Sequence, residues 1–124
     1  MARPPAYLQP MSSDKFKSFK AGETIFKKGD PGDAMFLIKS GQVEILVGDK
    51  LVELLGPEEF FGEMALIDHQ PRSANAVAQS DCEIEVIADK QFLFRVQEMP
   101  YFALKVMKVM AQRLRQTTAR TMEG

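Results

Sequence analysis

The segment from Phe60 to Ala74 holds the residue types with the most chemistry in this chain. Arg72 has a planar guanidinium that can donate two parallel hydrogen bonds to phosphate oxygens. Glu63 is only an acceptor when ionised, so it suits a sugar hydroxyl and not a phosphate. The amides after Gly62 can converge on an anion if a short helix starts there. With the hydroxyl of Ser73, these groups predict a pocket for a small anion that carries a free sugar hydroxyl, as a nucleotide does.

Short apolar stretches separated by turn residues surround this segment between Glu23 and Ala88. The breaks recur about every 8 to 12 residues, a spacing typical of an all-β sandwich or barrel. The stretches before and after Gly48-Asp49 form the clearest hairpin pattern. We expect strands at residues 24–27, 34–39, 42–47, 51–55, 74–78 and 83–88.

The pattern changes to helical spacing after Ala88. Asp89 is suited to cap a helix over 89–99, and Pro100 to begin a second helix over 100–121. The second helix carries two apolar sets: a heptad set of Leu104, Met107, Ala111, Leu114, Thr118 and Thr121, and a set of Phe102, Val106, Val109 and Met110. Either both sets pack on the β-domain, or one packs there and the other on a second copy, as a homodimer.

Length and composition indicate one ordinary globular domain of 124 residues, with 45% hydrophobic and 27% charged residues. The net charge of -1 gives no overall bias toward nucleic acid or membrane. Cys82 is the only cysteine, which excludes an internal disulfide. No apolar run approaches the roughly 20 residues that span a bilayer, so we expect a cytoplasmic protein. Residues 1–18, with three prolines, are expected to form an irregular leader with at most a short helical turn at 15–20.

The residue types argue against catalysis. A jelly-roll enzyme of the cupin type needs two or three histidines around a metal, whereas His69 is the only histidine of the chain. Nucleotide hydrolysis needs a nucleophile with its base, or a carboxylate cluster for a metal, and the segment has neither. We therefore expect no enzyme activity, no metal and no cofactor.

Two separated motifs resemble a known family. The run Phe61-Gly62-Glu63-Met64-Ala65-Leu66, followed by Pro71-Arg72-Ser73-Ala74, closely resembles the phosphate-binding cassette of cyclic-nucleotide-binding domains. That family includes the sensor domain of bacterial catabolite activator proteins, kinase regulatory subunits and nucleotide-gated channels. Upstream, the glycine-rich segment from Gly22 to Val43 is similar as well. The resemblance implies a mainly β fold at residues 19–122: a jelly-roll β-roll over 23–88, a short cassette helix, and helices over 89–99 and 100–121.

The resemblance also implies roles for individual residues. Arg72 would bind the exocyclic phosphate oxygens, and we expect it to be partly exposed or paired in the empty protein. Glu63 would accept from the ribose 2′-hydroxyl, Gly62 would allow close backbone approach, and Met64 and Ala65 would offer amides. Ser73 would contact phosphate or base. The pair Thr117-Thr118 aligns with a pair that contacts adenine in catabolite activator proteins, one hydroxyl coming from the neighbouring subunit; equally, it is a polar pair near a helix end.

The resulting prediction is a non-catalytic module that binds a cyclic nucleotide and shifts its C-terminal helices when it does so. The resemblance implies that a serine at position 73 favours cAMP, with cGMP left open. The alternative is the sensor fragment of a larger cAMP-responsive transcription regulator or ion channel. We expect no nucleic-acid or membrane partner for this chain itself, because the basic cluster of the last helix (Lys105, Lys108, Arg113, Arg115 and Arg120) is interpreted as a solvated face. The downstream effector is not identified.

Overall fold

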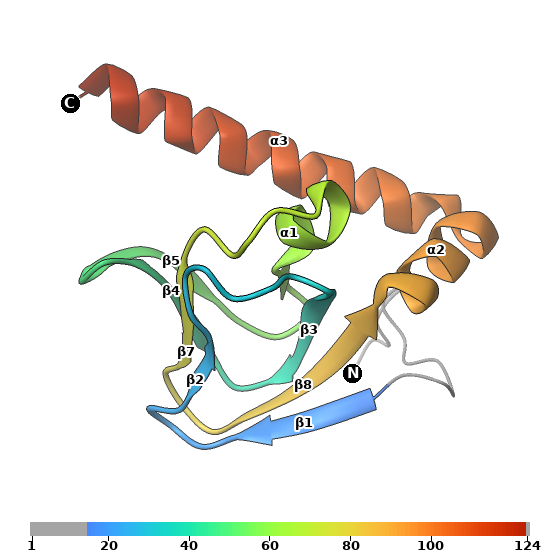
Figure 1. Ribbon diagram of the computed structural model, residues 1–124, viewed down its shortest axis with the longest axis horizontal. Coiled ribbons are helices and arrows are strands. Elements are labelled where there is room, and N and C mark those ends of the chain that lie inside the picture. The colour runs from blue at the N-terminus through green and yellow to red at the C-terminus, as the bar shows by residue number, and fades with distance from the viewer. Residues whose placement is uncertain (1–14, 124) are drawn as a thin grey trace.

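Two four-stranded antiparallel sheets form a β-roll (Figure 1). The computed structural model describes residues 15–123, with side chains as far as Gln116. One sheet has the order β1-β8-β3-β6 and the other β2-β7-β4-β5. The strands are β1 (Lys15–Phe19), β2 (Thr24–Phe26), β3 (Ala34–Ser40), β4 (Val43–Val47), β5 (Lys50–Leu55), β6 (Phe60–Phe61), β7 (Asn75–Ala78) and β8 (Cys82–Ala88).

The predicted fold class, a mainly β jelly-roll with C-terminal helices, is confirmed, and two strands differ from the prediction. The helical turn expected at 15–20 is wrong, because Lys15–Phe19 forms β1 and pairs with β8 along its whole length. Residues 15–18 of this strand also lie in the range 1–18, expected to be an irregular leader. A single helical turn over 15–20 is too short to stabilise itself, whereas pairing with β8 gives backbone groups of these residues hydrogen-bond partners. Strand β6 is too short to leave a pattern in the sequence.

Three helices complete the chain: α1 (Glu63–Asp68), α2 (Asp89–Glu98) and α3 (Pro100–Glu123). Asp89 does not cap α2 as expected, since Ala88 occupies the N-cap position and no side chain caps the helix. Asp89 is instead the first helical residue, where a negative charge is favoured by the helix dipole. Pro100 begins α3, at a position where its missing N–H costs nothing.

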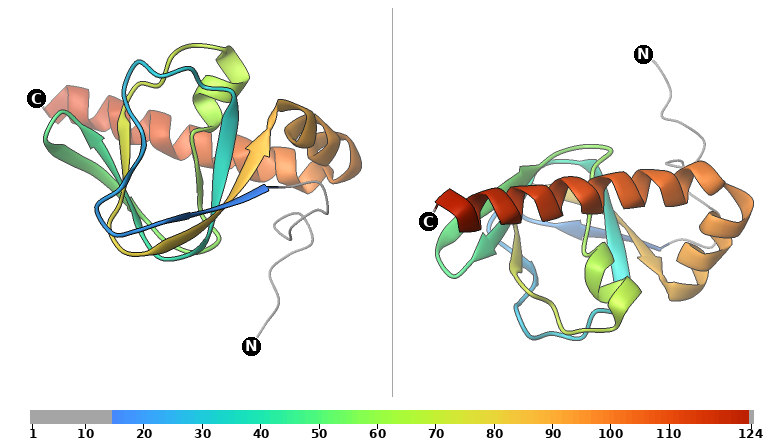
Figure 2. Two further views of the ribbon diagram at one scale, coloured as in Figure 1. Left: turned by 60° about the horizontal axis from the view of Figure 1, so that its bottom comes forward. Right: turned by 90° about the horizontal axis from the view of Figure 1, so that it is seen from above.

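The two sets of buried residues explain how the helices are held on the roll. Ala34, Phe36 and Ile38 of β3 point into the roll, while Met35 and Leu37 face the helices. Because both faces of β3 are buried, its sequence is a continuous apolar run instead of an alternating one. The helix-facing cluster consists of Met35, Leu37, Phe60, Leu66, Ile87, Phe102 and Val106. Helix α3 therefore lies across the roll, over α1 and next to α2 (Figures 1 and 2).

Only one of the two apolar sets of α3 packs on the β-domain. Phe102 and Val106 are buried, whereas Leu104, Met107 and Leu114 of the heptad set are 40%, 58% and 67% exposed. The alternative in which both sets pack on the domain is therefore wrong for these three residues. The side chains of Thr118 and Thr121 lie outside the described part of the chain.

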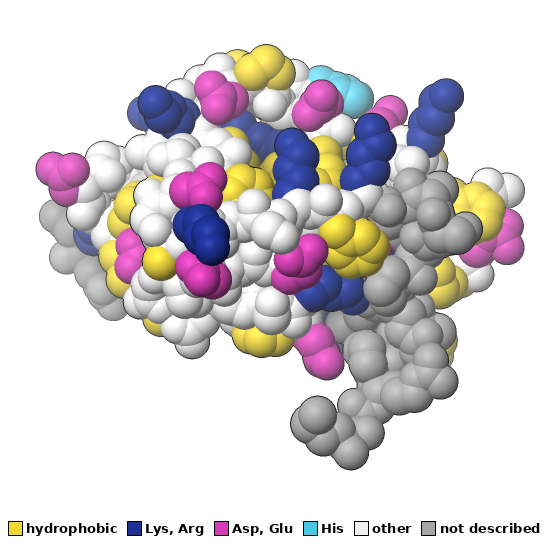
Figure 3. Space-filling model, turned by 90° about the horizontal axis from the view of Figure 1, so that it is seen from below, with side chains coloured by type: hydrophobic (Ala, Val, Ile, Leu, Met, Phe, Trp, Pro, Cys, Tyr) yellow, Lys and Arg dark blue, Asp and Glu magenta, His cyan; other side chains and the backbone are white. Residues whose placement is uncertain are grey.

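The surface and interior fit the balanced composition. On the face shown in Figure 3, acidic and basic side chains are interspersed, without a large field of one sign. Cys82 is a buried free thiol. Within residues 15–123, no helix is both long enough and apolar enough to cross a bilayer.

Candidate ligand-binding site

A cavity of about 320 Å³ opens between the segment that follows β6, the β4–β5 hairpin and α3. Apolar side chains of Phe26, Ile45, Val47, Val52 and Phe61 line one part of it. Polar groups gather in the other part, where the start of α1 faces the loop before β7. The six expected residues at positions 62–65, 72 and 73 all line this cavity, together with Glu53, Arg113 and Gln116. The cavity is thus suited to a ligand with one apolar end and one charged end.

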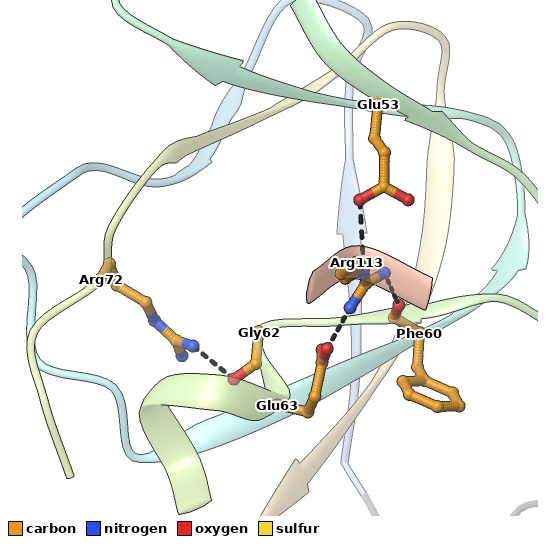
Figure 4. Close-up of polar contacts among 6 residues, drawn as sticks. All are labelled: Glu53, Phe60, Gly62, Glu63, Arg72 and Arg113. Atoms are coloured by element: carbon orange, nitrogen blue, oxygen red, sulfur yellow. Dashed lines mark hydrogen bonds and ion pairs between the residues drawn. The ribbon is translucent and has the colours of Figure 1, made fainter. Parts of the chain in front are cut away.

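Arg72 is buried in the wall of the cavity and is only 4% exposed. Its Nη1 donates to the carbonyl oxygen of Gly62 at 2.8 Å (Figure 4). Its Nη2 donates to the carbonyl oxygen of Ala34 at 2.7 Å. The guanidinium carbon lies 4.4 Å from the ring centre of Phe26, a cation–π distance. Of the two expected states, exposed or paired, partial exposure is wrong: Arg72 is buried, and two backbone carbonyls and an aromatic ring are its partners.

The charge of Arg72 is retained in this setting. Burial lowers the pKa of Arg72 from its ordinary value, while the carboxylates of Asp33, Asp30 and Glu63 act in the opposite direction. A guanidinium stays protonated at neutral pH even so. Its Nε is buried and has no hydrogen-bond partner among the described residues. A buried cationic donor without an acceptor is costly, so an anion that accepts from Nε would be stabilised here.

Gly62 permits the close approach of Arg72. It precedes α1 in the left-handed region at φ 79°, which side chains with a Cβ rarely adopt. A Cβ at this position would lie 2.8 Å from Nη1 of Arg72 and 3.2 Å from the Phe36 ring. Glycine is therefore required here both by the backbone conformation and by space.

Glu63 begins α1 and is buried, with 1% of its surface exposed. Its Oε1 accepts a hydrogen bond from Nη1 of Arg113, which reaches down from α3 (Figure 4). Its Oε2 is buried and has no partner among the described residues. The carboxylate is thus held from one side and presents an unused acceptor, as a ligand hydroxyl would require.

Arg113 is the site residue that sequence reasoning missed, together with its partner Glu53. The interpretation of Arg113 as part of a solvated basic face is wrong, since its side chain is 17% exposed and ion-paired with both Glu53 and Glu63. A signal was present in the spacing. Arg113 follows Val106 by seven residues, Val109 by four and Met110 by three, so it continues the helix face that packs on the domain.

The remaining expected residues occupy different positions around the cavity. Ala65 is buried, whereas Met64 and Ser73 are exposed residues of its lining. The side chains of Thr117 and Thr118 lie outside the described residues, and Gln116 just before them lines the cavity. His69 ends α1 and is absent from the lining of this cavity. Among the described residues, no three His, Cys, Asp or Glu side chains are grouped so that they could hold a metal ion.

Comparison with known proteins adds independent findings. A family model described as "Cyclic nucleotide-binding domain" matches residues 16–98. The Cyclic AMP receptor protein of Thermus thermophilus is 38% identical over 103 residues, which cover 79% of this chain and 48% of that protein. A cAMP-dependent protein kinase regulatory subunit of Debaryomyces hansenii is 41% identical over 81 residues, covering 64% of this chain and 18% of its own length.

A solved structure agrees with the sequence comparisons. The crystal structure of the Thermus thermophilus catabolite activator protein superposes with a TM-score of 0.81 at 33% identity, covering 93% of this chain and 55% of that one. The present chain therefore spans about half of the length of these bacterial relatives.

Proposed function

The chain belongs to the cyclic nucleotide-binding domain family, and we propose that it is a non-catalytic module that binds cyclic AMP in the cavity beneath α3. One observation carries the proposal. A buried cationic donor, Arg72 Nε, and a buried anionic acceptor, Glu63 Oε2, both lack partners among the described residues and belong to residues that line the same cavity. A cyclic nucleotide has a phosphate for the first and a ribose 2′-hydroxyl for the second.

The other lining residues suggest how the rest of the ligand would be held. The amides of Met64 and Ala65 would assist Arg72 at the phosphate, and Gly62 would allow the close approach. The base would lie against the apolar residues of the β4–β5 hairpin, where an aromatic ring system can bury its surface. Ser73 would contact phosphate or base, and Thr117 and Thr118 would contact the base.

Sensing would operate through α3, because this helix contributes a side chain to the site. Arg113 bonds to Glu63, so the position of α3 and the state of the ligand acceptor are linked. Ligand would favour the arrangement of the C-terminal helices in which the site is complete, a population shift limited by the difference in affinity between the two arrangements.

A second candidate is that this module is the sensor part of a longer cAMP-responsive regulator or channel. The observation that favours it is that the chain spans 48% of the Thermus receptor protein. The exposed heptad residues Leu104, Met107 and Leu114 also suit a homodimer through α3. Light scattering of the purified chain over a range of concentrations tests this pairing, and replacement of Met107 by Glu should abolish it.

Titration calorimetry with cAMP and cGMP tests the proposed function. We expect a dissociation constant in the micromolar range or tighter, which corresponds to about -8 kcal/mol, with cAMP preferred. Equal affinity for the two nucleotides would retain the site and remove the proposed base preference. If neither cAMP nor cGMP binds, the proposal is contradicted.

A further inference from the structure

Among the described residues, Arg113 donates to acceptors in the cavity wall that come from three parts of the fold. Its Nη1 donates to Glu63, its Nε donates to Oε1 of Glu53 at 3.1 Å, and its Nη2 donates to the carbonyl oxygen of Phe60 at 2.8 Å (Figure 4). Glu53 lies on β5 and is 25% exposed, whereas Glu63 is almost fully buried. The guanidinium therefore joins α3 to the hairpin, to β6 and to the start of α1.

The arrangement determines which oxygen of Glu63 remains available. A guanidinium beside a carboxylate, with no competing acceptor, prefers to form two parallel hydrogen bonds, one to each carboxylate oxygen. In this site Nε of Arg113 is directed to Glu53, and Glu63 receives a bond at Oε1 while Oε2 has no partner among the described residues. Loss of the Glu53 carboxylate would free Nε and allow Arg113 to occupy both oxygens of Glu63.

Charge supports the same conclusion. Glu53 and Glu63 share one cation, so Arg113 does not fully neutralise either carboxylate. Because Glu53 competes for Arg113, the ion pair between Arg113 and Glu63 is weaker, and Glu63 keeps more of its negative charge. In a desolvated site, a hydrogen bond from a hydroxyl to such a charged oxygen is strong.

We propose that Glu53 is a positioning residue that acts through Arg113 to keep Oε2 of Glu63 available to a ribose 2′-hydroxyl, and so sets the preference for a ribonucleotide over its 2′-deoxy analogue. This inference rests on the proposed function. Glu53 acts on the oxygen that receives the 2′-hydroxyl, so its loss should change the ratio of the affinities for the ribonucleotide and the 2′-deoxy analogue. A purely structural role would instead weaken the binding of both ligands equally.

The experiment compares cAMP with 2′-deoxy-cAMP by titration calorimetry. The unaltered protein should prefer cAMP by at least about tenfold, since a hydrogen bond to a charged group is lost with the deoxy ligand. Glu53→Ala should reduce this preference to about threefold or less, while its affinity for 2′-deoxy-cAMP stays within about twofold of the unaltered protein. Glu53→Gln, which preserves the packing of β5, should give an intermediate preference. Glu44→Ala, on β4 of the same hairpin and outside the cavity lining, should leave the preference unchanged.

A double-mutant cycle tests the route through Arg113. In an Arg113→Ala background, Glu53→Ala should cause no further change in the preference. Equal weakening of both ligands by Glu53→Ala, or an additive effect in the double variant, would overturn the inference and leave the proposed function standing. Absence of cAMP binding by the unaltered protein would instead overturn the proposed function, and the inference with it.

Discussion

Arg72 donates from Nη1 to the carbonyl oxygen of Gly62 at 2.8 Å, although ten residues separate them in the chain. The bond joins the two halves of the cassette across α1 and the loop that follows it. Because Gly62 lacks a Cβ, the guanidinium can lie directly against its backbone. The two residues therefore depend on each other, and changes at either should affect both the site and the fold.

Replacement of Arg72 by Ala should lower the affinity for cAMP by two orders of magnitude or more. Hydrogen bonds to a charged group contribute about 1.5 to 3 kcal/mol each, and the phosphate would lose its cationic donor. The change also leaves the carbonyls of Gly62 and Ala34 without this donor, which should cost about 1 to 3 kcal/mol of folding free energy for each carbonyl that stays unsatisfied. Calorimetry and urea unfolding measure the two effects, and an unchanged affinity would contradict the role assigned to Arg72.

Gly62→Ala should reduce both folding stability and ligand affinity. The left-handed backbone costs about 1 to 2 kcal/mol for a residue with a Cβ, and the new methyl would push Arg72 out of place. Gly48→Ala is the matched control: Gly48 also has a positive φ, of 62°, but a Cβ there meets nothing within 4 Å. Gly48→Ala should lose only the stability that the left-handed backbone costs, and it should retain full affinity for cAMP. Melting curves measure the stability and calorimetry measures the affinity.

Glu63→Gln should weaken cAMP binding by about tenfold or more and leave 2′-deoxy-cAMP almost unaffected. The amide oxygen of glutamine would remain directed at Arg113, so its NH₂ group would replace Oε2, the acceptor that has no partner among the described residues. A donor then meets the ribose hydroxyl where an acceptor is required. Similar losses for both ligands, measured side by side, would show that Glu63 acts on the structure of the site and not on the hydroxyl.

Arg95 and Glu85 form a fully buried ion pair at 2.7 Å that ties α2 to β8. Removal of one partner leaves a buried charge with less compensation, and Arg95→Met should therefore lower the free energy of unfolding by about 3 to 5 kcal/mol. The double variant Glu85→Leu/Arg95→Met should recover much of this loss, because apolar side chains of similar size can replace such a pair. Urea midpoints of the single and double variants test this, and a double variant less stable than the single one would refute it.

Cys82 should make folding stability sensitive to alkaline pH. Burial raises the pKa of the Cys82 thiol, which donates to the carbonyl oxygens of Gln42 and Ser80 at 3.2 Å. The unfolded thiol then ionises first as the pH rises, and the stability contributed by the protonated native thiol is lost above the ordinary cysteine pKa of about 8.5. Urea midpoints from pH 7 to 10 should fall less steeply for Cys82→Ala, and an identical pH dependence would exclude this contribution.

The local signals in the sequence were sufficient for six of the eight described strands and for the cassette. Alternation of apolar residues and turns between Glu23 and Ala88 predicted the strand positions to within a residue or two, because side-chain period and turn chemistry are properties of neighbouring residues. The order of Gly62, Glu63, Arg72 and Ser73 likewise identified one segment as the candidate site, and the structure places all four around one cavity.

Tertiary structure decided what distant residues do to one another. Sequence spacing could not show that Lys15–Phe19 would form a strand by pairing with the edge of β8. Nor could it show that Arg72 would be buried against Phe26, or that Arg113 and Glu53, 60 residues apart, would meet at Glu63. These outcomes depend on strand pairing, burial and the direction in which α3 crosses the roll, and such quantities exist only once segments far apart in the chain are packed together.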